Sequence, residues 1–177
     1  MADGGQQVGQ VEVMETEKQA EKKKKRNVLI AIDGSKHAEN AFKWYADNIH
    51  KTTDDVILGF CSELGTHLPP TAAQVSPATL HALIEKHNGK AKEIFSTFDS
   101  LATKHNVQHK LERLRDPPGS SIVNYAHEHN VQLIVVGSRG HGTIRRTILG
   151  SVSDYVVHHS HVPVIICKHH DEHHKLK

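Results

Sequence analysis

The sequence predicts an α/β fold with three layers, in which helices cover both faces of a doubly wound, five-stranded parallel sheet. Short apolar runs rich in β-branched residues recur along the chain, and segments with helical periodicity separate them. Strands that alternate with helices pair in parallel through right-handed crossovers. Proline within a strand is confined to edges or bulges, so Pro163 places the last strand at one edge, and the polar strand Val107–Leu114 suits the other. The strand order 3-2-1-4-5 satisfies both conditions.

Five segments have the composition of strands. Most are short, apolar runs bounded by glycine, aspartate or a polar loop, which is typical of strands buried on both faces of a parallel sheet. The third is polar and alternates only weakly, as expected at an edge. In chain order the predicted strands are Val28–Ile32, Val56–Cys61, Val107–Leu114, Leu133–Val136 and Val162–Cys167.

The segments between the strands have helical periodicity and residues that typically begin helices. The second predicted helix is long, and we expect it to bury apolar residues from Leu80 to Leu101 along one side. Gly89 interrupts this helix at a point where it could bend. The expected helix starts, in chain order, are Ser35, Ser76 with Pro77, Ser120 or Ser121, and Gly150 with Ser151.

The 177 residues divide into one domain and two polar tails. Residues 1–26 contain few large apolar residues and end in the basic run Glu21–Arg26, so we expect a disordered tail. Residues 27–168 form the domain, and residues 169–177 form a histidine-rich tail. The basic run could serve as a nuclear address, although a solvated linker is the favoured interpretation.

Composition excludes several classes of protein. The net charge of +2 is too small to indicate a nucleic-acid partner, and no apolar run is long enough to span a membrane. The N-terminus lacks the apolar core of a signal peptide. The two cysteines, Cys61 and Cys167, lie far apart and imply no disulfide framework, which suits a reducing compartment. We therefore expect a protein that is not secreted.

The stretch Val131–Ser153 contains the chemistry of a phosphate site. A buried strand leads into a loop rich in glycine and arginine, and Gly150 with Ser151 then opens a helix. Glycines let backbone N–H groups approach a bound group, and a helix N-terminus offers unpaired donors with a positive dipole end. Neither a P-loop nor the Rossmann glycine fingerprint is present. The alternative is a tight strand-to-helix turn with solvated arginines.

The predicted topology independently indicates the same place. In the order 3-2-1-4-5 the winding reverses between the first and fourth strands, and ligands of such sheets bind outside the carboxyl ends of the strands at the reversal. The residues directly after these two strands are Asp33-Gly34-Ser35 and Gly137–Gly140. The fold and the phosphate chemistry therefore predict one common site.

Four motifs, in order and at matching spacing, resemble those of the universal stress protein family. They are I-A-I-D-G-S at Ile30–Ser35, V-V-G-S-R-G at Val135–Gly140, L-G-S-V-S at Leu149–Ser153 and V-P-V at Val162–Val164. The resemblance covers about Arg26 to Lys168. It implies the ATP-binding branch of the family, because the glycine signature is complete, and an adenine-nucleotide-binding, Rossmann-like type of fold. It also implies a cytoplasmic, nucleotide-dependent, homodimeric regulatory module of the stress response.

The same resemblance implies the nucleotide-binding residues. Asp33 would bond the ribose, while Ala31 and the backbone of Cys61 would border the adenine. Val136 would lie against the nucleotide, with Mg²⁺ as the expected companion of ATP. The remaining residues would meet the ribose and the phosphates: Gly137, Ser138, Arg139, Gly140, Gly150, Ser151, Val152 and Ser153. Phe60 stands where the family usually has a histidine, which places base selectivity in question.

The predicted partner is a second copy of the chain, because Val162–Cys167 is an apolar edge strand that needs a cover. The alternative function is a slow ATPase or phosphotransferase at the same site, for which Asp33 and His141 are the nearby candidate bases. We assign no catalytic residue and no metal site. The tail His169–His174 has histidine pairs that could grip zinc in a helix, but a flexible polar tail is favoured.

Overall fold

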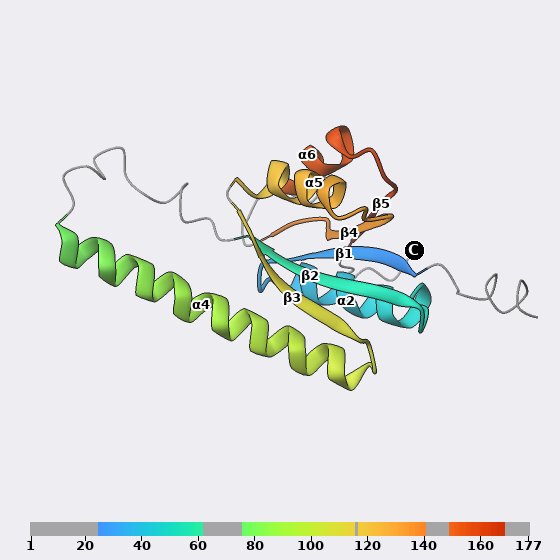
Figure 1. The fold of residues 1–177 in the computed structure, drawn as a ribbon, viewed down its shortest axis with the longest axis horizontal. Helices are drawn as coiled ribbons and strands as arrows, with labels where there is room; N and C mark the ends of the chain where they lie inside the picture. Colours follow the sequence, from blue (N-terminus) through green and yellow to red (C-terminus); the bar gives the residue numbers. More distant parts are fainter. Residues whose placement is uncertain (1–24, 62–75, 116, 141–148, 169–177) are drawn as a thin grey trace, which may run out of the picture.

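The computed structural model describes residues 25–61, 76–115, 117–140 and 149–168 (Figure 1). The predictions for residues 1–24, for the C-terminal tail and for His141 lie outside these residues. The predicted N-terminal tail extends too far, because Arg26 is the first residue of the first strand and bonds to Asp54. Strands and helices alternate along the described chain. In order they are β1 (Arg26–Ile32), α2 (Lys36–Asn48), β2 (Asp54–Cys61), α4 (Pro77–Lys104), β3 (His109–Leu114), α5 (Pro118–Glu128), β4 (Leu133–Gly137), α6 (Ser151–His159) and β5 (Val164–Cys167).

The sheet has five strands in the order β3-β2-β1-β4-β5, and every neighbouring pair is parallel. Helices α2 and α4 cover one face of the sheet, and α5 and α6 cover the other (Figure 1). A separate apolar core fills each interface: Phe42, Tyr45 and Phe98 belong to the first, and Leu29 and Ile134 to the second. The predicted fold class and strand order are therefore confirmed.

Helix α4 buries only half of the face that the sequence predicts. Its buried residues run from Ala91 to Ala102, whereas Leu80 and Ile84 are 40% and 39% exposed. The helix has 28 residues, which corresponds to about 42 Å, and its first half reaches past the strands (Figure 1). Helical periodicity shows which side of a helix is apolar. It does not show how much of that side the neighbouring sheet covers. Gly89 lies inside this single helix.

Several predicted boundaries differ from the structure. Strands β1 and β2 begin two residues before the predicted strands, and β3 and β5 begin two residues after them. Helix α5 begins at Pro118 with Pro117 as its N-cap, so Ser120 and Ser121 lie inside the helix, and Ser120 Oγ donates to the Pro117 carbonyl at 3.2 Å. Proline suits the first helical position because its missing N–H is not needed there. Strand β5 begins at Val164, one residue after Pro163, although the Pro163 carbonyl still accepts from the Ile134 N–H at 3.0 Å. The predicted edge position of β5 is nevertheless confirmed.

Among the described residues, no helix combines the length and the apolar character required to cross a membrane.

Candidate functional site

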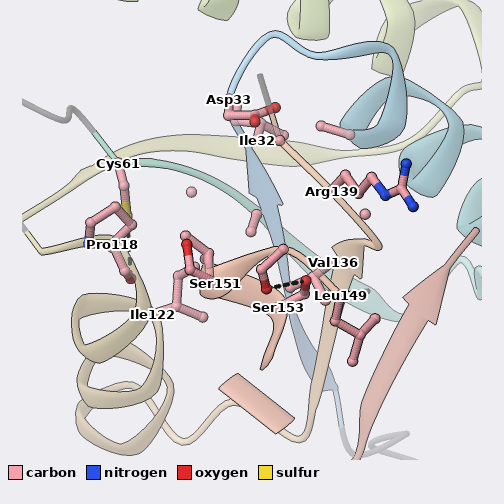
Figure 2. A pocket seen from close by; sticks show the side chains of 17 residues that line it. Ile32, Asp33, Cys61, Pro118, Ile122, Val136, Arg139, Leu149, Ser151 and Ser153 are labelled. Atoms are coloured by element: carbon pink, nitrogen blue, oxygen red, sulfur yellow. Dashed lines mark hydrogen bonds between the residues drawn. The ribbon is translucent and has the colours of Figure 1, made fainter. Parts of the chain in front are cut away.

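A cavity of about 440 Å³ opens where β1, β2 and β4 end, at the reversal of the winding (Figure 2). Apart from Ser138, all the residues predicted to bind nucleotide line it. Sequence reasoning missed six others: Ile32, Ala38, Gly59, Pro118, Ile122 and Leu149. Ile32 and Leu149 directly adjoin predicted residues, whereas Pro118 and Ile122 come from α5, for which no motif gave a signal.

The turn after β1 holds a carboxylate at the cavity. Asp33 Oδ1 accepts from the backbone N–H of Ser35 at 2.9 Å, and Gly34 makes the turn with a positive φ of 78°. Ser35 caps α2 as predicted, because its Oγ accepts from the Ala38 N–H at 3.2 Å. A Cβ at Gly140 would lie 2.6 Å from Asp33 Oδ2. The glycine therefore permits the loop after β4 to approach this carboxylate.

The end of β4 is also pressed against α2. A Cβ at Gly137 would lie 2.8 Å from the backbone carbon of His37. Backbone atoms cannot move aside as a flexible side chain can, so a larger residue would force β4 and α2 apart. Gly137 thus shapes the wall of the cavity through helix–sheet packing.

The first turn of α6 lines the cavity, and its backbone N–H groups have no side-chain cap. Its N-cap is Gly150, which has no side chain to accept from the first-turn N–H groups. These groups belong to Ser151, Val152 and Ser153, all of which line the cavity. Helix α5 likewise begins without a side-chain cap, and its Pro118 lines the cavity too. The start of α6 gives its side of the cavity a positive potential that favours an anion, whereas Pro118 has no N–H and lies beside Cys61 on the apolar side.

Ser138 is placed differently from its predicted partners. It is only 8% exposed, and it contributes through its backbone. Its N–H donates to the Cys167 carbonyl at 2.8 Å, and its carbonyl accepts from the Gly150 N–H at 2.9 Å. The peptide of Ser138 therefore joins β5 to the start of α6 behind the cavity wall. It has no direct position in the cavity lining.

The side of the cavity formed by the end of β2 and the start of α5 is apolar. Cys61 and Pro118 lie together there, with the Cys61 Sγ–H donating to the Pro118 carbonyl at 3.7 Å, and Arg139 lies on the other side (Figure 2). Gly59 allows the wall to pack closely, because a Cβ at this position would lie 2.9 Å from Cδ1 of Leu29. This part of the cavity suits a flat, weakly polar group.

Phe60 does not enter the cavity. It is buried in the core under α2 and α4, where its ring meets that of Phe95 edge-on with centroids 5.7 Å apart. Phe60 therefore contributes to the packing of α4 on the sheet and does not contact the predicted site of the base. The second cysteine, Cys167, does not line the cavity either, and burial raises the pKa of its thiol to about 11.

The sequence model of the Universal stress protein family matches residues 24–168. The chain belongs to this family. A Staphylococcus aureus (strain USA300) protein described as a universal stress protein is 30% identical over 148 residues, which cover 81% of this chain and 84% of the relative.

Solved structures of the family share the fold. Universal stress protein UspA from Lactobacillus plantarum superposes with a TM-score of 0.66 at 24% identity, over 80% of this chain and 96% of that one. An Arabidopsis thaliana family protein solved with AMP bound gives 0.60 at 18% identity, over 82% and 92%. A universal stress protein from Archaeoglobus fulgidus, in complex with dAMP, gives 0.57 at 22% identity, over 80% and 96%.

Proposed function

We propose that this protein is an ATP-binding, homodimeric regulatory module of the universal stress protein family that acts in the cytoplasmic stress response. The observation that carries the proposal is the uncapped N-terminus of α6 beside an apolar recess in one cavity. Such a pairing of anion-binding donors with an apolar wall fits a nucleotide, which has phosphates at one end and a flat base at the other.

The ligand's three parts match three regions of the lining. The base fits between Ala31 and the Cys61–Pro118 side of the cavity. The ribose hydroxyls are suited to Asp33, an acceptor held at the turn after β1. The phosphates are suited to the first-turn N–H groups of α6, with Ser151 as an additional hydroxyl donor. The family relatives solved with AMP, dAMP and cAMP support an adenine nucleotide as the ligand class.

A binding role is favoured over ATP hydrolysis. Among the lining residues that the structure describes, Asp33 is the only carboxylate, and none is a histidine. Asp33 is assigned to the ribose hydroxyls, so it is not available as the base for an attacking water. A Mg²⁺ that accompanies ATP would be held by the phosphate oxygens and by water.

The test is calorimetric titration of ATP into variants at Ser151, the exposed first residue of α6. Ser151→Ala should weaken binding by roughly 1–2 kcal/mol, the value of one charge-assisted hydrogen bond. Ser151→Glu should weaken it by about 2–3 kcal/mol, since it adds a like charge beside the phosphates. A glutamate in a first turn stabilises the helix dipole, so the melting temperature should not fall.

The matched control is Ala78→Glu, which adds the same charge to the exposed first turn of α4. It should leave ATP affinity unchanged. Wild-type affinity in Ser151→Glu, or an equal loss in Ala78→Glu, would show that the start of α6 is not the phosphate site.

A further inference from the structure

Ser153 carries one of the few buried polar side chains among the described residues. It belongs to the first turn of α6 and is only 3% exposed. Its Oγ lies 2.9 Å from the Gly150 carbonyl oxygen (Figure 2) and 3.3 Å from the Ser138 carbonyl oxygen, which that figure does not draw. Both partners are acceptors, so the single hydroxyl proton is directed at the backbone behind the cavity wall.

These two acceptors belong to different segments of the fold. Gly150 precedes Ser153 in the same turn, whereas Ser138 comes directly after β4 and lies 15 residues away in the chain. The Ser138 carbonyl also accepts from the Gly150 N–H at 2.9 Å. The hydroxyl of Ser153 and the N–H of Gly150 thus converge on one carbonyl and tie the start of α6 to the end of β4.

This arrangement limits which donors a phosphate can use. The Gly150 N–H is already bonded to Ser138, and the Ser153 hydroxyl points to the backbone. The first-turn N–H groups have no side-chain cap and face the cavity. Their direction depends on the orientation of the Gly150 peptide, which is the group that Ser153 holds.

We propose that Ser153 is a positioning residue of the nucleotide site. Its hydroxyl fixes the Gly150 peptide against Ser138, so that the first-turn N–H groups of α6 are aimed at the phosphates, and the hydroxyl itself does not bind them. This inference rests on the proposed function for its ligand, but the fixing of the Gly150 peptide is a property of the protein without nucleotide.

Removal of the hydroxyl should leave the fold intact. In Ser153→Ala, the Gly150 carbonyl keeps its bond from the Asp154 N–H at 2.9 Å, and the Ser138 carbonyl keeps the Gly150 N–H. No buried acceptor loses its last partner, so the large penalty of an unsatisfied group is avoided. Ser153→Thr retains the hydroxyl and serves as the conservative variant.

The first experiment measures hydrogen exchange at single amides by NMR on the nucleotide-free protein. In Ser153→Ala, the amides of Gly150 and Asp154 should exchange roughly tenfold faster, because the local turn opens more easily. The Ser138 amide, which donates to Cys167, should exchange as in the wild type and is the internal control. Ser153→Thr should restore the slow exchange. Wild-type exchange at Gly150 in Ser153→Ala would overturn the proposal.

The second experiment compares ATP with adenosine. Ser153→Ala should weaken ATP binding about tenfold and leave adenosine binding unchanged, since adenosine lacks the group that α6 would hold. A loss of ATP affinity without faster exchange at Gly150 would mean that the hydroxyl is a direct phosphate ligand, which contradicts the proposal. If the wild type binds neither compound, the proposed function fails, while the exchange measurement still decides whether Ser153 fixes the turn.

Discussion

Asp54, a buried carboxylate at the start of β2, receives hydrogen bonds from three directions. Arg26 donates through Nε at 3.0 Å and through Nη2 at 2.6 Å, Tyr45 donates its hydroxyl at 2.7 Å, and Lys51 donates its backbone N–H at 3.0 Å. These residues join β1, α2 and the loop before β2 at the end of the sheet opposite to the cavity. The cluster therefore serves stability, away from the nucleotide site.

Burial alone would raise the pKa of the Asp54 carboxyl, but the hydrogen bonds from Arg26, Tyr45 and Lys51 more than offset it, so the pKa lies below its usual value. Loss of the carboxylate should be costly, because it removes the charged partner of the Arg26 guanidinium and leaves it the Ile49 carbonyl, at 3.2 Å, as its remaining acceptor. We expect Asp54→Asn to lower the free energy of unfolding by about 3 kcal/mol. The control is Asp55→Asn, whose exposed pair with Lys25 at 3.4 Å should be worth less than about 0.5 kcal/mol.

Urea unfolding at several pH values checks the sign of this effect. A carboxyl whose folded pKa is depressed adds stability above its unfolded pKa, near 3.9, and this contribution disappears as the pH falls through the lower folded pKa. The difference between wild type and Asp54→Asn should therefore be constant near neutral pH and shrink below about pH 4. A difference that persists undiminished in acid would rule out the ionised form as its source.

The role of a single residue can be predicted from the sequence when its partners are close to it in the chain. Ser35 could be predicted as a cap because the amphipathic segment that it caps begins at the next residue, and the structure confirms that role. The position of Ser138 behind the cavity wall could not be predicted, since it depends on bonds to Cys167 and Gly150 in other segments. The role of Asp54 depends in the same way on Arg26, which is 28 residues distant in the chain.

Two helical glycines differ in their surroundings. A Cβ at Gly89 in α4 would meet no atom within 4 Å, whereas a Cβ at Gly119 in α5 would lie 2.8 Å from the ring of Tyr155 in α6. Glycine costs about 0.5–1 kcal/mol relative to alanine inside a helix. Gly89→Ala should therefore raise the melting temperature, with a gain of up to about 1 kcal/mol.

Gly119→Ala is the matched comparison and should lower the melting temperature, because α5 and α6 must separate or Tyr155 must change its rotamer. Thermal unfolding followed by circular dichroism measures both variants. If Gly89→Ala also destabilises the protein, α4 requires a backbone conformation at Gly89 that differs from a regular helix, which contradicts the prediction.

Helices and strands were predictable wherever their signals are local in the chain. Alternation of apolar runs and amphipathic segments located every described helix and strand. The predicted start of α5 is wrong, since Pro117 is the N-cap without a side-chain bond and Pro118 is the first residue of the helix. The extent of the buried face on α4 was overestimated for a different reason. It is set by the length of the neighbouring strands, and the helix's own sequence does not contain that information.

The strand order of the whole molecule could be predicted from which strands tolerate an edge. Polar residues on β3 and Pro163 beside β5 marked the two edges, and the order 3-2-1-4-5 satisfies both edge conditions with parallel crossovers. The winding reversal located the cavity by the same reasoning. The contribution of α5 to the lining could not be predicted from motifs, because Pro118 and Ile122 reach the cavity only through the packing of α5 on the sheet.

The two edges of the sheet differ in character, and this difference leads to a prediction for the whole molecule. On β3 the exposed side chains are mainly charged, which discourages a second strand from pairing there. On β5, Val164, Ile165 and Ile166 are only partly buried although they are apolar. Among the described strands, only β4 pairs with β5, so its other edge is open. A second copy related by a two-fold axis would cover this surface.

We therefore expect a homodimer at micromolar concentration, and we expect Val164→Lys to dissociate it, because a lysine would have to be buried without a partner at the centre of the contact. Leu111→Lys is the matched control, since Leu111 is a similarly apolar residue, 37% exposed, on the opposite edge strand β3. Sedimentation velocity distinguishes the cases. The expected result is a dimer for the wild type and for Leu111→Lys, and a folded monomer for Val164→Lys. Dissociation by Leu111→Lys alone would place the interface on β3. If the wild type is a monomer, a second copy of the chain does not cover the apolar edge of β5, and the prediction is wrong.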